Sequence, residues 1–130
     1  MTAQKTILLV DQDPSYRAVF ASALSQHGYH VLTAADSRSA LEQATNPELH
    51  IDSIVTDILL PGKNGLKLIQ SLRLLPHHTH TPILIVTTLE ASDVGLVANL
   101  REALGVIGYL VKQKCRPSDI VHAINHTTGT

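Results

Sequence analysis

The sequence predicts an α/β domain built on a doubly wound parallel sheet, and two observations carry this prediction. Short apolar runs containing β-branched residues alternate with segments whose apolar residues recur at helical spacing, joined by loops of a few residues. The runs are also apolar on consecutive residues, which is typical of strands covered by helices on both faces. With 130 residues, 44% of them hydrophobic and 16% charged, the chain fits one domain spanning 1–130.

Five apolar runs are the expected strands. In chain order they are 7–10, 29–34, 51–56, 82–86 and 108–111. The run 82–86 is the most hydrophobic of them. Connections of this length between consecutive strands favour parallel pairing, because each strand is followed by a helix that returns the chain to the same end of the sheet.

The first helix has start and stop signals on both sides. Pro14 suits a first helical turn, Asp13 suits its N-cap, and Gly28 stops the helix. The apolar stripe between them consists of Tyr16, Val19, Phe20, Ala23 and Leu24. This spacing predicts one face packed on the sheet.

The four later helices follow the same logic. Asp36 or Ser37 caps the second, a Pro61-Gly62…Gly65 loop precedes the third, Ser92 caps the fourth, and Pro117 opens the fifth. Their expected inward residues are Ala40, Leu41 and Ala44; Leu66, Leu68, Ile69 and Leu72; Val94, Val97, Leu100 and Leu104; and Ile120, Val121 and Ile124.

Four polar residues follow directly on separate apolar runs: Asp11, Asp57, Thr87 and Lys112. The carboxyl ends of parallel strands meet at one edge of a sheet, where ligands bind in folds of this kind. Carboxylates gathered there repel one another unless a cation lies among them, so we expect the Lys112 ammonium, Mg²⁺ or both. A carboxylate in such a site can accept a phosphoryl group, and Asp57 would fill that role.

Four stretches together resemble the receiver domain of two-component response regulators. They are 7–11, 54–62 with Asn64 and Gly65, 82–87, and 108–112. The resemblance covers essentially the whole chain and implies a flavodoxin-like fold with five parallel strands in the order 2-1-3-4-5 and helices on both faces.

The resemblance also implies a role for each matching residue. Asp57 is the expected phosphoacceptor, and Lys112 contacts the phosphoryl group. Thr87 and Tyr109 form the expected switch pair. The Mg²⁺ ligands would be Asp11, Asp57 and the backbone carbonyl of Leu59, with Gln12 or Asp13 as a further candidate. The implied partners are a sensor histidine kinase or phosphotransfer protein and a downstream protein or output domain.

The acidic pair after the first strand departs from the family pattern. The family has two adjacent acids there, whereas this chain has Asp11-Gln12. An amide oxygen can coordinate a hard cation but adds no charge, so we expect weakened Mg²⁺ binding unless Asp13 takes part. Asp13 is favoured as the N-cap instead, because it stands directly before Pro14.

Other departures concern the rim of the site. Leu59 and Leu89 are apolar where family members often have polar residues that position water, which predicts slow loss of phosphate. Thr88 is bulkier than the usual small residue. Gln113 replaces the usual proline after Lys112, so we expect a trans bond and a shifted loop, because a cis bond without proline costs about 3 kcal/mol.

Some candidate groups have plainer interpretations. His77, His78 and His80 could bind a transition metal or sense pH, but histidines clustered in a polar loop are expected to be solvated. Cys115 has no adjacent His/Asp arrangement and reads as an ordinary loop thiol. Gly62 and Gly65 match the family loop and are also turn glycines.

Composition excludes several functional classes. The net charge is −1 and no Lys/Arg run occurs, so direct nucleic-acid binding is not expected. No apolar run approaches the length of a membrane span, and the N-terminus has no signal-peptide pattern. With a single cysteine, these features favour a cytoplasmic location.

Three functions remain open. The leading one is a phosphorylation switch that alters a partner-binding face and is not a turnover enzyme. We expect exposed apolar groups on that face, contributed by Leu96, Ile120, Val121 and Ile124. Such a face would also allow a homodimer. The second is a pseudo-receiver that binds partners without phosphorylation. The third, remote one is a phosphatase similar to the haloacid dehalogenases, with Asp11 as nucleophile.

Overall fold

The computed structural model describes residues 4–61, 65–90 and 94–128. The strands are β1 (Thr6–Val10), β2 (His30–Ala34), β3 (Ser53–Thr56), β4 (Ile83–Thr87) and β5 (Val106–Val111). The helices are α1 (Pro14–Gln26), α2 (Ser37–Ala44), α3 (Gly65–Arg73), α4 (Val94–Leu104) and α5 (Pro117–Thr128). Two short 3₁₀ turns, η1 (Pro76–His78) and η2 (Lys112–Lys114), follow α3 and β5.

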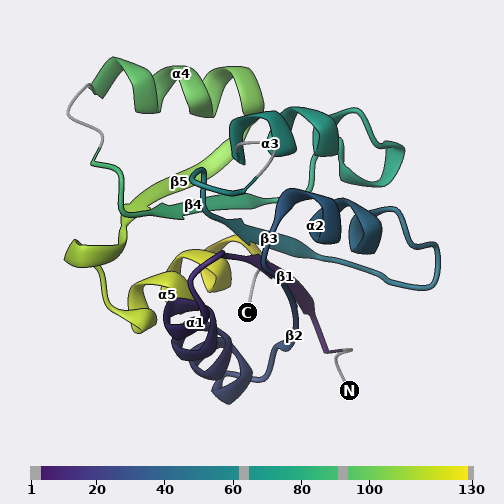
Figure 1. The fold of residues 1–130 in the computed structure, drawn as a ribbon, viewed down its shortest axis with the longest axis horizontal. Helices are drawn as coiled ribbons and strands as arrows, with labels where there is room; N and C mark the ends of the chain where they lie inside the picture. Colours follow the sequence, from purple (N-terminus) through teal and green to yellow (C-terminus); the bar gives the residue numbers. More distant parts are fainter. Residues whose placement is uncertain (1–3, 62–64, 91–93, 129–130) are drawn as a thin grey trace.

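All five strands belong to one parallel sheet in the order β2-β1-β3-β4-β5. Helices α1 and α5 cover one face of this sheet, and α2, α3 and α4 cover the other (Figure 1). The predicted fold class and the strand order implied by the resemblance are therefore confirmed.

Burial on both faces of the sheet explains the continuous apolar runs. In β1, Leu8 and Val10 belong to the core under α2 and α3, whereas Ile7 and Leu9 belong to the core under α1 and α5. All four side chains are at most 1% exposed. Successive residues of a strand point to opposite faces, so a strand covered on both sides needs apolar residues at every position.

The signals predicted for α1 are confirmed at both ends. Asp13 is the N-cap and Pro14 opens the helix, which ends at Gln26 before Gly28 adopts a positive φ of 91°. The stripe prediction fails at Val19, which is 50% exposed. Phe20 and its neighbours already fill the space against the sheet, so Val19 falls just outside the buried arc of the helix.

The second helix begins as predicted, with the Asp36 carboxylate accepting a hydrogen bond from the Ser39 N–H at 2.8 Å. In α3, Leu68, Ile69 and Leu72 are fully buried. The predicted cap Ser92 and the loop residues Gly62 and Asn64 lie outside the described residues.

Several strand boundaries differ from the prediction by one or two residues. Two strands shift by two residues: β3 starts at Ser53 rather than at 51, and β5 starts at Val106 rather than at 108. Gly105 ends α4 with a φ of 65°, so the chain turns directly into the strand. The extra residues are accommodated by a register shift against β4 between Ile83 and Leu84.

The last helix does not expose the apolar groups that were expected on a partner face. Ile120, Val121 and Ile124 are at most 3% exposed and pack in the core under α1 and α5. That part of the prediction is wrong because the three residues all face the sheet. The side chain of Leu96, like those of Val94 and Val97, lies outside the described part of the chain.

Candidate functional site

Two buried carboxylates and one ammonium meet at the carboxyl edge of the sheet. Asp11 and Asp57 follow the paired strands β1 and β3, and Lys112 follows β5. The Lys112 Nζ lies 2.8 Å from Asp11 Oδ2 and 2.8 Å from Asp57 Oδ2. The side chain of Lys112 is 2% exposed and those of the two aspartates are 3% exposed. The long lysine side chain thus reaches across β4 and bridges both acids.

The second oxygen of each carboxylate is held by the backbone. Asp11 Oδ1 accepts a hydrogen bond from the Asp13 N–H at 2.9 Å. Asp57 Oδ1 accepts one from the Leu59 N–H at 2.9 Å. Each carboxylate therefore has its two oxygens on different donors, which fixes the orientation of both groups.

Burial and ion pairing act in opposite directions on the charges of this site. Burial raises the pKa of Asp11, and this effect outweighs the opposing influence of Lys112. Burial alone would lower the pKa of Lys112, but its hydrogen bonds to Asp11 and Asp57 prevail and raise it. Lys112 therefore carries its positive charge at neutral pH.

The predicted switch residues both contact the backbone of Leu89. Thr87 is fully buried at the end of β4, and its Oγ1 accepts a hydrogen bond from the Leu89 N–H at 3.3 Å. The Tyr109 hydroxyl donates to the Leu89 carbonyl at 2.6 Å. Burial, and then the charge of Asp57, raise the pKa of Tyr109. The loop after β4 thus connects the two side chains through one residue.

Asp13 is engaged as a helix cap and Gln12 faces solvent. The Asp13 Oδ1 accepts hydrogen bonds from the N–H groups of Ser15 at 2.8 Å and Tyr16 at 3.3 Å. The favoured interpretation of Asp13 as an N-cap is confirmed. The side chain of Gln12 is exposed, unlike those of Asp11 and Asp57.

The donors at this edge fit a hard cation, but with fewer charges than the family pattern provides. Within the described residues no group of three or more His, Cys, Asp or Glu side chains is arranged to hold a metal. Asp11 and Asp57 supply two carboxylates, and Lys112 already lies against both. Carboxylate and carbonyl oxygens are the ligands that Mg²⁺ prefers. The oxygens at this edge therefore suit Mg²⁺ chemically, but the two carboxylates supply little negative charge to hold it.

The segment after Lys112 forms a short 3₁₀ turn. No peptide bond in the described segments is cis, which agrees with the trans Lys112–Gln113 bond that was expected. The Gln113 Nε2 donates to the Thr88 carbonyl at 3.1 Å. Gln113 therefore ties the loop after β5 to the loop after β4.

The predicted solvation of the histidine cluster is wrong for one of its members. His77 and His80 are exposed, but His78 is only 4% exposed. Its Nδ1 lies 2.8 Å from the Thr81 Oγ1. Burial is the main cause that lowers the pKa of His78. The hydrogen bond to the Ala44 carbonyl opposes this shift and the charges of the nearby basic groups reinforce it, so the ring is neutral at pH 7.

Arg73 cross-links the backbone around His78, and the sequence did not single it out as a candidate residue. Its guanidinium donates to the carbonyls of His78, Thr81, Leu104 and Gly105 at 2.7–3.2 Å. Arg73 thereby joins the loop after α3 to the end of α4. An arginine in the last turn of a helix is common, and no sequence signal distinguishes one that collects four carbonyls.

The reading of Cys115 as an ordinary thiol fits its surroundings. The residue is partly buried, and its Sγ lies 4.0 Å from the Lys112 carbonyl. Burial, followed by the charge of Asp119, raises the pKa of the thiol. The reactive thiolate form is therefore disfavoured.

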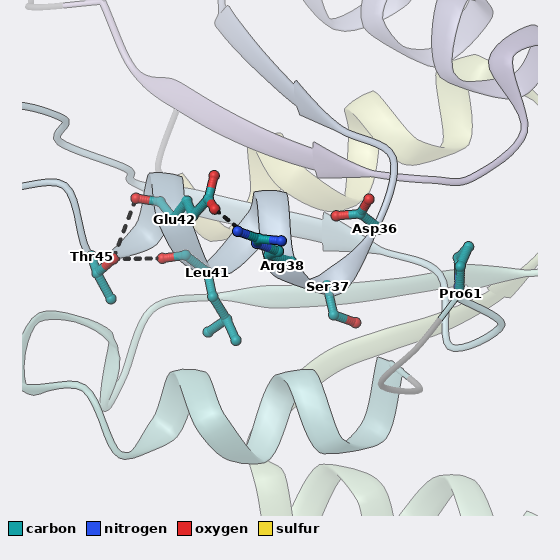
Figure 2. A pocket seen from close by; sticks show the side chains of 7 residues that line it. All are labelled: Asp36, Ser37, Arg38, Leu41, Glu42, Thr45 and Pro61. Atoms are coloured by element: carbon teal, nitrogen blue, oxygen red, sulfur yellow. Dashed lines mark hydrogen bonds and ion pairs between the residues drawn. The ribbon is translucent and has the colours of Figure 1, made fainter.

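One cavity in the described structure lies away from the acidic site. It has a volume of about 700 Å³ and is lined by α2, the residues beside it and Pro61. Figure 2 shows Leu41 and the Arg38–Glu42 ion pair on α2, with Pro61 contributed by the loop after β3. None of the four strand-end residues lines this cavity.

The fold and site together define a doubly wound α/β domain with two lysine-bridged carboxylates at the carboxyl edge of its sheet. The family model of the response regulator receiver domain matches residues 7–125 of the chain. The chain belongs to this family, whose members are phosphorylatable switches of two-component systems rather than typical enzymes and generally bind Mg²⁺ through acidic residues.

Two curated regulators of Escherichia coli are similar to the chain. The regulatory protein AtoC is 30% identical over 112 residues, covering 86% of this chain and 23% of AtoC. The transcriptional regulatory protein CpxR is 32% identical over 106 residues, covering 82% of this chain and 42% of CpxR. The chain thus spans less than half the length of these relatives.

Solved structures give the same assignment. The chemotaxis response regulator CheY4 of Vibrio cholerae has a TM-score of 0.83 at 29% identity, covering 95% of this chain and 98% of that chain. A response regulator from Chloroflexus aurantiacus has a TM-score of 0.83 at 29% identity, and the match covers 98% of this chain and 100% of that chain. Among the described residues, no helix has the length and apolar character needed to cross a membrane.

Proposed function

We propose that Asp57 accepts a phosphoryl group from the phosphohistidine of a sensor kinase or phosphotransfer protein. The observation that carries this proposal is the position of Lys112, whose ammonium lies 2.8 Å from the Asp57 carboxylate. An Asp57 oxygen forms the new bond to phosphorus as the bond from phosphorus to the histidine nitrogen breaks. The Lys112 ammonium then offsets charge on the phosphoryl oxygens, and the Thr87 hydroxyl can donate to one of them.

The closed state of the site sets a condition on this reaction. The Asp57 side chain is 3% exposed, so the donor reaches it only after neighbouring groups move. The Lys112–Asp57 ion pair is the contact that the incoming phosphoryl group replaces. Leu59, which is 42% exposed, and Leu89, which is 47% exposed, lie on the loops that follow β3 and β4.

Phosphorylation would be transmitted through the loop after β4. Thr87 and Tyr109 are both bonded to the backbone of Leu89. If Thr87 turns toward the phosphoryl group, its bond to Leu89 is lost and the Tyr109 hydroxyl can change partners. Such a shift between two arrangements would alter the face formed by α4, β5 and α5.

Mg²⁺ would be held weakly, by Asp11, Asp57 and the Leu59 carbonyl. The two aspartates are the carboxylates of the site, Gln12 is exposed, and Asp13 is committed to capping α1. When bound, the ion would add positive charge near the phosphoryl oxygens. Lys112 provides part of that charge by itself.

The wider assignment follows the family. Residues 1–130 form one receiver domain, either complete in itself or joined to an output domain, as the longer regulators AtoC and CpxR suggest. A downstream protein or a second copy of the chain would read the switch. The domain would act in the cytoplasm without binding nucleic acid directly, consistent with a net charge of −1.

The proposal is tested by the intact mass of the protein after incubation with acetyl phosphate, with and without Mg²⁺. We expect one added phosphoryl group on the wild type, none on Asp57→Asn, and a high Mg²⁺ concentration for half-maximal modification. No modification of the wild type under any condition would favour the pseudo-receiver, a binding module for which the closed site and Gln12 are the supporting observations.

The phosphatase alternative is not favoured by the surroundings of its required groups. Its mechanism needs a free acid two residues after the nucleophile Asp11, but Asp13 accepts two N–H hydrogen bonds at the start of α1. Hydrolysis of a phosphomonoester that is abolished by Asp11→Asn would restore this alternative.

Phosphate loss should be slow because the side chain at Leu59 cannot orient an attacking water molecule. We expect Leu59→Asn to shorten the lifetime of the phosphorylated protein several-fold, since the amide can hydrogen-bond water near the phosphorus atom. The measurement is phosphate release after removal of the donor. Leu74→Asn is the matched control, because Leu74 is 85% exposed and lies after α3. Equal decay of Leu59→Asn and wild type would reject this explanation.

A further inference from the structure

Tyr16 lies against the buried ammonium at the centre of the site. The Lys112 Nζ is 4.7 Å from the centroid of the Tyr16 ring. The same Nζ is hydrogen-bonded to Asp11 and Asp57, so an aromatic ring is the third group around it. The face of an aromatic ring carries partial negative charge and attracts a cation, most strongly where water is excluded.

Three contacts hold the ring in this position. The Tyr16 N–H donates to the Asp13 cap at 3.3 Å, which places the residue in the first turn of α1. The ring packs 5.4 Å from the buried Phe20 ring. The neighbouring Arg17 donates to the Asp11 carbonyl at 2.7 Å and so fastens α1 to the end of β1. The Asp-Pro start of α1 therefore fixes an aromatic ring over the site.

We propose that Tyr16 is a positioning residue for phosphorylation, acting through Lys112. Its ring shields the ammonium from water and holds Nζ toward the two carboxylates, where the phosphoryl oxygens would arrive. This inference rests on the proposed function of Asp57 but concerns a residue to which the resemblance assigns no role. An exposed ammonium would be hydrated, and it would neutralise phosphoryl charge less effectively.

The test compares Tyr16→Leu with Tyr16→Phe. Leucine keeps an apolar side chain but has no ring, whereas phenylalanine keeps the ring and loses only the hydroxyl. With acetyl phosphate as donor, we expect Tyr16→Leu to lower the maximum rate of modification about five- to tenfold and to leave the half-saturating donor concentration unchanged. Tyr16→Phe is the rescue variant and should restore the wild-type rate within about twofold.

A second measurement does not depend on phosphorylation. Acetic anhydride modifies accessible amines, and mass spectrometry gives the extent of acetylation of Lys112 relative to the exposed Lys114 in the same sample. We expect Tyr16→Leu to raise the relative labelling of Lys112 about tenfold and Tyr16→Phe to leave it near the wild-type value. Urea denaturation followed by circular dichroism verifies that both variants are folded under the assay conditions, which contain no urea.

The outcomes separate this inference from the proposed function. A wild type that is modified by acetyl phosphate, with Leu and Phe variants that react and label alike, would overturn the role of Tyr16 alone. A wild type that takes no phosphoryl group would overturn the proposed function, and the Lys112 labelling would still decide whether Tyr16 shields the ammonium. A rise in labelling in both variants would also contradict the proposal, because it would assign the shielding to the hydroxyl.

Discussion

Replacing Gly65 with alanine is expected to lower the free energy of unfolding by about 3 to 5 kcal/mol, because a methyl group has no room at this position. A Cβ on Gly65 would overlap the carbonyl oxygen of Asp57 and the Cα of Ile58. Both are backbone atoms, so no side-chain rotation can relieve the overlap. The Gly65 N–H also donates to the Ile58 carbonyl at 2.9 Å, which holds α3 against the loop that follows Asp57.

Urea denaturation followed by circular dichroism measures this effect, and Gly28→Ala is the matched control. Gly28 has a φ of 91° but no atom within 4 Å of an added Cβ, so its substitution tests conformational strain without a clash. We expect the free energy of unfolding of Gly28→Ala to fall by about 1 to 2 kcal/mol. If Gly65→Ala lost no more than Gly28→Ala, the close approach between α3 and the Asp57 loop would not constrain the fold as described.

The edge of the sheet at which the site forms was predictable because the physical rule is local. Each of Asp11, Asp57 and Lys112 ends an apolar run, and parallel strands place such ends together. The sequence did not show that one ammonium would bridge both acids, since β5 is separated from β3 by β4. Nor did it show that the Asp57 side chain would be 3% exposed. Both facts depend on how the loops pack over the edge.

The histidine cluster shows why other features escaped prediction. His77 and His78 are adjacent in a polar loop and cannot be told apart by composition. The structure buries His78 because Thr81 and the Ala44 carbonyl at the end of α2 supply its polar partners. Ala44 is far from His78 in the sequence, so no local pattern records the contact. The predicted burial of Val19 was wrong for a related reason. The spacing of apolar residues defines a helical face, but it does not show how much of that face the neighbouring elements cover.

Replacing Lys112 with methionine is expected to lower the free energy of unfolding at pH 7 by about 3 to 5 kcal/mol. Methionine keeps an apolar stem of similar length but leaves Asp11 and Asp57 buried without the shared cation. The matched control is Lys114→Met, since Lys114 lies two residues further on and its side chain is 67% exposed. Its ion pair with Glu90 is on the surface, so we expect a loss below about 1 kcal/mol.

The pH dependence of the Lys112→Met variant identifies the cause of the loss. Burial already raises the pKa of Asp11 above its ordinary value of 3.8, and removal of the ammonium raises it further. Between 3.8 and this raised value, the native chain binds more protons than the unfolded chain, so the free energy of unfolding increases as the pH falls. Adding Asp57→Asn to Lys112→Met should recover much of the stability at pH 7 and flatten this pH dependence, because only one buried carboxylate remains. A variant whose stability falls on acidification from pH 7 to 5, or that gains nothing from Asp57→Asn, would show that Lys112 acts through packing rather than by balancing the two acids.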